Sequence, residues 1–325
     1  MDSQYPIKPI DLDGISTYPI ESRKSKVHTG VFGKPHDGSE NILAFITKLP
    51  QILAGNSLRK LIQAILYARA SNKPILWGFG GHVIKVGLGP VLIDLLQSGF
   101  ITGIAMNGSA AIHDFEVAFR GATSEEVEEQ LGDGRFGMAR ETAEYMNAAV
   151  DSASKDGIGM GEALGRFIAA SGEKGLKFAH SNASVLAEAY ARRVPVTVHV
   201  AIGTDTIHAH PKTSGESLGA STHRDFKLFC SMVRELDSGG VYVNVGSAVV
   251  LPEVFLKAVS VVRNLGHSLE EFTTANLDFV QHYRPTQTVL KRPTQNSGQS
   301  IALTGHHEIM VPLIAAALKG SLEKK

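Results

Sequence analysis

Glycines follow the apolar run 74–79 at positions that suit the binding of a phosphate. They are Gly80, Gly81, Gly87 and Gly89, and an apolar-periodic segment that predicts a helix comes after them. Because glycine has no Cβ, its backbone N–H groups can approach a pyrophosphate closely, and the next helix offers its positive end. The spacing differs from G-x-G-x-x-G, so tight turns and close helix packing are an equally open interpretation.

A second strand-like run, 100–106, ends in three small or polar residues. Asn107, Gly108 and Ser109 form this turn, and another helical segment follows. Strand, glycine loop, helix, strand, small-residue turn and helix together form a βαβ unit. Such a unit binds an anionic or nucleotide ligand at the carboxyl ends of its strands.

Histidines gather after the β-branched run 195–202. His208 and His210 alternate, so in an extended segment both rings would face the same side. With ligands from nearby or later loops they would form a site for zinc or a related ion, and His306 is the third ligand we select. The other ligands available are His199, Asp205, His307 and Glu308. Hydrogen-bonded loop histidines, or a general base beside a cofactor, are the alternative interpretation.

Strand-like runs alternate with helical segments, which predicts an α/β fold with a doubly wound, mainly parallel sheet and helices on both faces. Strands are expected at 74–79, 100–106, 195–202, 240–245, 272–276 and 301–303. Helices are expected at 43–70, 91–99, 136–150, 159–170, 182–193, 222–236, 252–263 and 309–318. We also expect a capped helix start at Ser124, a flexible joint over 151–159 and an irregular stretch over 277–300. The loops that follow the strands should converge on one edge.

Composition narrows the class of protein. The 325 residues are 43% hydrophobic and 20% charged, with 32 basic and 32 acidic residues and no long basic block, which argues against nucleic acid as a partner. The single cysteine excludes an intrachain disulfide framework.

Residues 1–40 are polar and proline-rich and predict an N-terminal arm, and residues 41–325 predict a single α/β domain. No apolar run is long enough to span a bilayer and no signal peptide is evident, so we expect a cytoplasmic protein without a membrane partner.

Several short motifs resemble deoxyhypusine synthase. The resemblance covers the chain from about residue 73 and lies in 87–114, Thr204-Asp205, 246–250, 273–275, Arg284-Pro285 and Pro312-Leu313. It implies a Rossmann-like, NAD-binding fold and a homotetramer. It also implies NAD contacts from Gly246, Thr274 and Ala275 and an amine pocket at Asp205.

The chain departs from that family mainly at the chemistry. Ile112-His113 stands where the family has two glutamates, and Lys291 comes slightly earlier than the family's imine-forming lysine and lacks its tryptophan. Transfer to a protein lysine with Lys291 as nucleophile is therefore the less favoured form of the reaction.

We therefore predict an NAD-dependent enzyme of transferase or oxidoreductase type that acts on an amine-bearing small molecule such as a polyamine. Asp205 would anchor the amine, and His113, His208 or His306 would be the acid–base group. The pyrophosphate would lie against 80–89 and the turn 107–109. Two alternatives remain open: a zinc-dependent hydrolase that uses the histidine loops, and a catalytically silent nucleotide-binding module.

Overall fold

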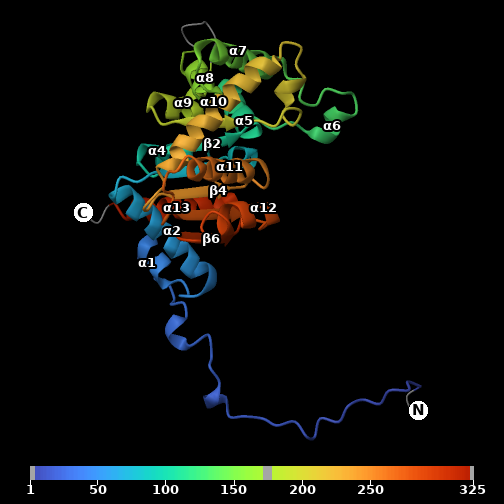
Figure 1. Ribbon diagram of the computed structural model, residues 1–325, viewed down its shortest axis with the longest axis vertical. Coiled ribbons are helices and arrows are strands. Elements are labelled where there is room, and N and C mark those ends of the chain that lie inside the picture. The colour runs from blue at the N-terminus through green and yellow to red at the C-terminus, as the bar shows by residue number, and fades with distance from the viewer. Residues whose placement is uncertain (1–3, 171–177, 323–325) are drawn as a thin grey trace.

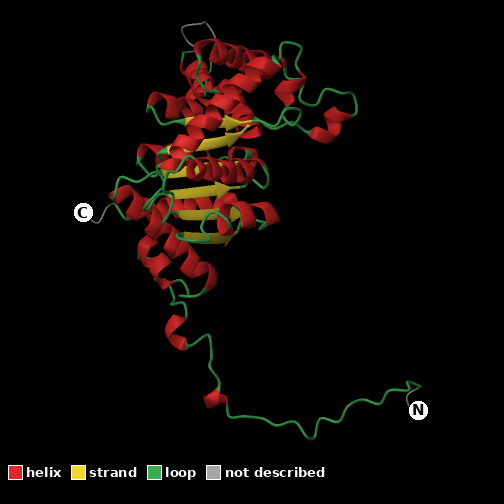
Figure 2. Ribbon diagram, in the orientation of Figure 1, coloured by secondary structure: helices red, strands yellow, loops and turns green. Residues whose placement is uncertain are grey.

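A six-stranded sheet forms the centre of the protein (Figures 1 and 2). The computed structural model describes residues 4–170 and 178–322. The strand order is β3-β2-β1-β4-β5-β6, and all neighbours pair in parallel. The strands are β1 (Ile75–Phe79), β2 (Gly103–Asn107), β3 (Val196–His199), β4 (Val241–Val245), β5 (Thr273–Asp278) and β6 (Gln299–Thr304). This is the order of a Rossmann-type doubly wound sheet, so the predicted fold class is confirmed.

Side chains of the central strands β1, β2 and β4 alternate between two apolar clusters. In β1, Ile75, Trp77 and Phe79 belong to the larger cluster and Leu76 to the smaller one. The same period of two places Tyr242 of β4 in the smaller cluster, stacked on Phe255 with ring centroids 4.0 Å apart. Both faces of the central strands are therefore buried, whereas one face of the edge strand β6 is exposed.

Helices cover both faces of the sheet. α2, α4, α5, α9 and α13 contribute to the larger cluster, whereas α10, α11 and the π-helical segment η6 cover the other face. α7 and α8 pack beyond β3 and form the upper part of Figure 1 with α9 and α10. The first helices are α1 (Ile42–Lys48), α2 (Leu53–Ala70), α3 (Gly81–Lys85), α4 (Gly89–Gln97), α5 (Gly108–Arg120), α6 (Val127–Leu131) and α7 (Arg140–Asp156). The others are α8 (Met160–Ala169), α9 (Val185–Ala191), α10 (Gly215–Arg234), α11 (Val250–Asn264), α12 (Tyr283–Pro285) and α13 (His307–Gly320). Short helical turns are η1 (Ile20–Ser22), η2 (Thr29–Val31), η4 (Ser181–Ala183), η5 (Thr206–Ala209) and η6 (Thr286–Lys291).

Several predicted helix boundaries were wrong for local reasons. The helix expected over 43–70 is two helices, because Pro50 cannot donate a backbone hydrogen bond and keeps Leu49 extended at ψ 150°. Ser124 does not cap a helix: its φ is +71°, and α6 begins at Val127. The expected flexible joint is the last part of α7, which ends where Gly157 takes a left-handed conformation. The stretch 277–300 also contains α12 and η6.

The N-terminal segment extends away from the sheet (Figure 1). From residue 4 to about residue 40 it is exposed and holds only the short turns η1 and η2. The first three residues of the predicted arm lie outside the described residues. Among the described helices, none combines the length and the apolarity that crossing a membrane requires.

Two buried carboxyl groups connect helices to their surroundings. Asp114 of α5 accepts hydrogen bonds from the Ser184 hydroxyl (2.6 Å) and from the N–H groups of Val185 (2.8 Å) and Leu186 (3.1 Å), which begin α9. Asp225 of α10 accepts from the N–H groups at the start of α8 and in β3. Each carboxyl group thus caps a helix that is distant in sequence.

Replacing Asp114 with alanine should destabilise the fold strongly. The change leaves three buried donors without a partner, so we expect the free energy of unfolding to fall by about 3 kcal/mol or more. Urea denaturation measures this. Asp94→Ala is the matched control, because Asp94 makes an exposed ion pair with Lys319 and its loss should cost about 1 kcal/mol or less. Equal losses in the two variants would contradict the capping role.

Candidate functional site

The loops after β1 and β4 touch at the point where the strand order reverses. A Cβ built on Gly80 would lie 2.5 Å from the carbonyl oxygen of Gly246, so the two backbones meet without room for a side chain. Gly246 has φ +60°, and a Cβ there would collide with the ring of His307. In open α/β sheets, ligands bind in the crevice at this switch point. The structure thus brings together Gly80, Gly246 and the start of α13.

Two helices that begin around this point, α3 and α13, have no side-chain cap, because their N-cap residues, Gly80 and His306, accept no hydrogen bond through a side chain. At the start of α11 the Ser247 hydroxyl accepts from the Leu251 N–H at 3.3 Å, and Pro252 has no N–H. At the β2 end of the same edge, Asn107 caps α5 by accepting from the N–H of Ala110 at 2.9 Å. The first turns of α3 and α13 therefore leave N–H groups available to an anion.

An amide network fixes the turn that contains Gly246. The Asn244 side chain donates to the Ser247 carbonyl (2.9 Å) and to the Asn276 side chain (2.7 Å). Asn276 in turn donates to the side chain of Gln281 at 2.8 Å. These buried amides link the carboxyl ends of β4 and β5 and hold the turn after β4 in place.

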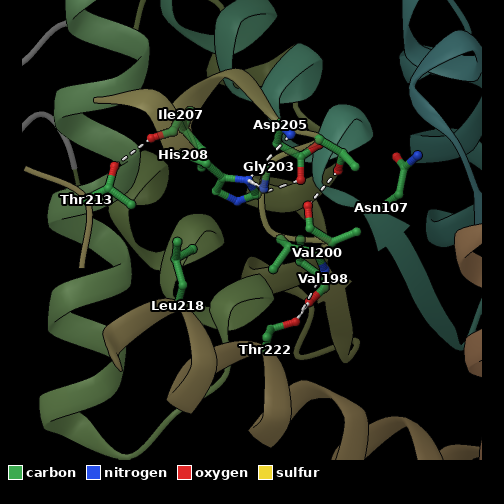
Figure 3. A network of polar contacts seen from close by, with 12 residues as sticks. Asn107, Val198, Val200, Gly203, Asp205, Ile207, His208, Thr213, Leu218 and Thr222 are labelled. Atoms are coloured by element: carbon green, nitrogen blue, oxygen red, sulfur yellow. Dashed lines mark hydrogen bonds and ion pairs between the residues drawn. The ribbon is translucent and has the colours of Figure 1, made fainter. Parts of the chain in front are cut away.

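Asp205 and His208 form a buried pair beside the start of α5 (Figure 3). The Nδ1 atom of His208 accepts from the Gly203 N–H at 3.2 Å, which places the proton of the neutral ring on Nε2. That Nε2 lies 3.8 Å from Oδ2 of Asp205, and neither atom has a hydrogen-bond partner among the described residues. Burial raises the pKa of Asp205 to about 6 and lowers the pKa of His208.

Asp205 also occupies the place predicted for a phosphate. Its carboxyl group lies against Gly108, where a Cβ would collide with it. A carboxylate at a helix N-terminus takes the position that an external anion would take. The pyrophosphate contact predicted at the turn 107–109 is therefore filled by the protein in this structure.

His113 is joined to a carboxylate through a threonine. Nδ1 of His113 lies 2.7 Å from the Thr123 hydroxyl, which donates to Glu116 at 2.5 Å. Because that hydroxyl hydrogen is used, Thr123 accepts from Nδ1–H, and Nε2 of the neutral His113 ring is left as an acceptor. Burial acts to raise the pKa of Glu116, but the nearby His113 and the hydrogen bonds from Thr123 and Thr142 outweigh it and lower that pKa.

An acidic cavity lies next to the hydrogen-bonded group of His113, Thr123 and Glu116, which we call the relay. It encloses about 550 Å³, and its lining contains two arginines and five glutamates: Glu116, Glu125, Glu126, Glu129 and Glu141. Its wall is close to the Asp205 loop, because a Cβ on Gly137 would meet Thr206 at 2.6 Å and Gly137 donates to Glu125. The larger cavity of about 620 Å³, lined by Arg69 and Lys73, adjoins Pro74 and Thr102 at the opposite end of the strands.

The other glycines predicted for the site lie at the start of α3 and past its end. A Cβ on Gly81 would collide with Ser109 and would reach the His113 ring at 3.0 Å, so these three are neighbours. Gly87 forms an open turn with φ +81°, and Gly89 packs on the Ala183 carbonyl, both past the end of α3.

Three further predicted residues are distant from the carboxyl edge. Thr274 and Ala275 are fully buried within β5. Lys291 is exposed at the end of η6, two residues before the Pro293 carbonyl that accepts a hydrogen bond from Arg263 in the last turn of α11. The structure therefore does not bring Lys291 to Asp205.

The three histidines predicted to bind zinc are separated. His208 and His210 follow β3 and His306 follows β6, and these strands are the two outer strands of the sheet. The 3₁₀ turn η5 also replaces the extended segment that would have aligned His208 with His210. Within residues 4–170 and 178–322, no three histidine, cysteine or acidic side chains are grouped as a metal site.

Sequence reasoning missed Asn244, Asn276 and Gln281. The signal for Asn244 and Asn276 is a polar residue near the end of an apolar strand, in VYVNV and TTANLD, whereas Gln281 follows the strand and has no such signal.

Comparisons with solved structures show this fold in other proteins. A conserved LOR/SDH-type protein from Methanococcus maripaludis S2 aligns at 16% identity over 93% of this chain and 75% of its own, with a TM-score of 0.53. ArgZ, an arginine dihydrolase of cyanobacteria, aligns at 15% identity over 83% of this chain and 33% of its own, with a TM-score of 0.51. AgrE in a complex with ornithine and NAD⁺ aligns at 12% identity over 84% of this chain and 35% of its own, with a TM-score of 0.52.

These likenesses concern the fold. The chain spans about a third of the length of ArgZ and AgrE. A protein from Entamoeba histolytica described as a deoxyhypusine synthase also aligns, at 10% identity over 88% of this chain and 96% of its own. Its TM-score is 0.48, a likeness too distant to support a shared function. The sequence matches no family model and no curated protein.

Asp205→Asn should reduce the dependence of stability on pH. The folded-state pKa of about 6 exceeds the ordinary value of 3.8, so the folded protein binds this proton more tightly than the unfolded chain. The free energy of unfolding therefore falls as pH rises from about 4 to about 6. Asparagine cannot ionise, so urea titrations across this range should show a decline smaller by roughly 2 kcal/mol. Parallel curves for both proteins would contradict the shifted pKa.

Proposed function

We propose that the chain binds NAD or a similar dinucleotide across the switch point and acts on an amine-bearing small molecule by dehydrogenation or transfer. The observation that carries this proposal is the meeting of two helix starts without a side-chain cap, those of α3 and α13, around Gly80 and Gly246. N–H groups there would hold the pyrophosphate. The structure of AgrE with NAD⁺ and ornithine supports the proposal, because that protein shares the fold.

The amine would lie at the other end of the edge. Five glutamates and two arginines line the cavity next to Glu116, so its field attracts a cation and repels a phosphate. Asp205 adds a buried carboxyl oxygen without a partner. An amine bound here would have charge-assisted hydrogen bonds available from both sources.

His113 is the acid–base group that the geometry favours. Its Nε2 is a free acceptor, whereas the Nε2 of His208 already carries the proton and is directed at Asp205. Bound NAD would supply an acceptor for the hydride that leaves the carbon next to the nitrogen, and His113 would take the proton that the nitrogen releases as the C=N bond forms. Glu116, through Thr123, would stabilise the charged ring that results.

Other parts of the sequence-based prediction stay predictions. They are the homotetramer, the cytoplasmic location and the absence of nucleic-acid and membrane partners. NAD binding without turnover of any amine would correspond to the silent nucleotide-binding module.

NAD should raise the melting temperature, and Val249→Asp should abolish most of that rise. Val249 is the exposed N-cap of α11, which begins next to Gly246, so a carboxylate there would repel the pyrophosphate. We expect at least a tenfold weaker NAD affinity in thermal-shift titrations. Val249→Asn is the matched control, because it has nearly the same shape as aspartate without the charge and should weaken binding less. An unchanged melting temperature of the wild-type protein with NAD would overturn the proposal.

Thr123→Val should change the protonation pattern of His113. Without the hydroxyl, Nδ1 loses its acceptor, and the ring should shift towards the form with the proton on Nε2. Heteronuclear NMR of the imidazole nitrogens reports the two forms without any substrate. Thr142→Val is the control, because Thr142 bonds Glu116 at 3.1 Å but does not contact His113. A wild-type ring without a proton on Nδ1 would contradict the relay.

A further inference from the structure

Four rings from the segments that follow β1, β5 and β6 meet beside the switch point. We name His82, Phe279, His306 and His307 the aromatic shelf. The centroid of Phe279 lies 6.0 Å from His82, 5.9 Å from His307 and 6.1 Å from His306, whose plane is inclined by only 10°. Phe279 is 48% exposed and His306 is mostly exposed, so two nearly parallel, stacked rings are open to solvent.

Polar groups beneath the shelf lack partners. His307 is 1% exposed, and neither of its ring nitrogens has a hydrogen-bond partner among the described residues. Its ring lies against Gly246, and its Nε2 is 3.7 Å from Oδ1 of Asp278. Buried nitrogens without hydrogen bonds are costly, which is typical of a place where a ligand supplies the missing partner. This observation is independent of the uncapped start of α13.

We propose that the aromatic shelf binds the purine base of the dinucleotide, with the nicotinamide end directed towards β2, Asp205 and His113. This inference rests on the proposed function. Purines stack on exposed aromatic faces, and the shelf provides such a face next to the predicted pyrophosphate position. The segments after β2 and β3 instead contribute carboxyl groups and His113, which suit the nicotinamide end of the dinucleotide, where the reaction would occur. The division of the edge into a stacking end and an acid–base end thus sets the direction of the ligand.

The acidic groups beside the shelf define which dinucleotide fits. Asp278 ends β5 with Oδ1 accepting from the Phe279 N–H at 2.9 Å, and Glu308 follows on α13. A carboxylate at a strand end accepts hydrogen bonds from ribose hydroxyls and repels a 2′-phosphate. The ligand is therefore NAD rather than NADP.

Isothermal titration calorimetry of the full chain tests this subsite with NAD, NADP, AMP and nicotinamide mononucleotide. Phe279→Ala should weaken binding of both NAD and AMP about tenfold, the loss of one stacked base, and leave nicotinamide mononucleotide unchanged. Phe279→Leu, which keeps apolar volume without a flat face, should behave similarly. Val280→Ala is the matched control, because Val280 is equally exposed next to the shelf and belongs to no ring contact.

Each of the other possible results overturns a specific part of the proposal. If NAD binds but Phe279→Ala weakens only nicotinamide mononucleotide, or weakens neither fragment, the shelf and the direction are wrong while the proposed function stands. NADP binding as tight as NAD would overturn the ribose contact at Asp278. If NAD and both fragments fail to bind the wild-type protein, the proposed function falls and this inference falls with it.

Discussion

Parallel pairing of all six strands is the constraint on which the rest of the structure depends. A parallel pair cannot be closed by a hairpin, so each connection must cross a face of the sheet, and helices then cover both faces. Apolar side chains fill the two layers, with Trp77 on one side and Tyr242 on the other. The same constraint places every strand's carboxyl end at one edge, and that edge carries all the residues we assign to the site.

This edge is electrostatically divided. Around β1 and β6, the uncapped starts of α3 and α13 and the buried His307 leave N–H groups and ring nitrogens unsatisfied. Around β2 and β3, the protein fills the helix start with its own Asp205 carboxyl and surrounds the neighbouring cavity with glutamates. An anion is favoured at the first end and a cation at the second, which is the arrangement needed to hold a dinucleotide beside an amine.

Buried carboxyl groups have two distinct roles in this protein. Asp114 and Asp225 accept hydrogen bonds from N–H groups at the start of another helix, which offsets part of the cost of their burial. Burial raises the pKa of all three carboxyl groups, to about 6 for Asp114 and Asp205 and to about 7 for Asp225, and Oδ1 of Asp225 lacks a partner as Oδ2 of Asp205 does. Asp205 differs in its place, beside His208 and against Gly108 at the carboxyl edge of the sheet. That place, and not the pKa, distinguishes the carboxyl group that we assign to the site.

The sequence by itself determined the local elements and the class of fold. Period-two and period-3.6 patterns located the strands and most helices, and alternation of the two was enough for a doubly wound sheet, because these signals come from neighbouring residues. The tertiary structure decided which loops meet. Strand order separates His306 from His208, directs Lys291 away from Asp205 and joins Gly80 to Gly246 and His307. Pairing between distant strands depends on packing of the whole chain, and no local pattern contains it.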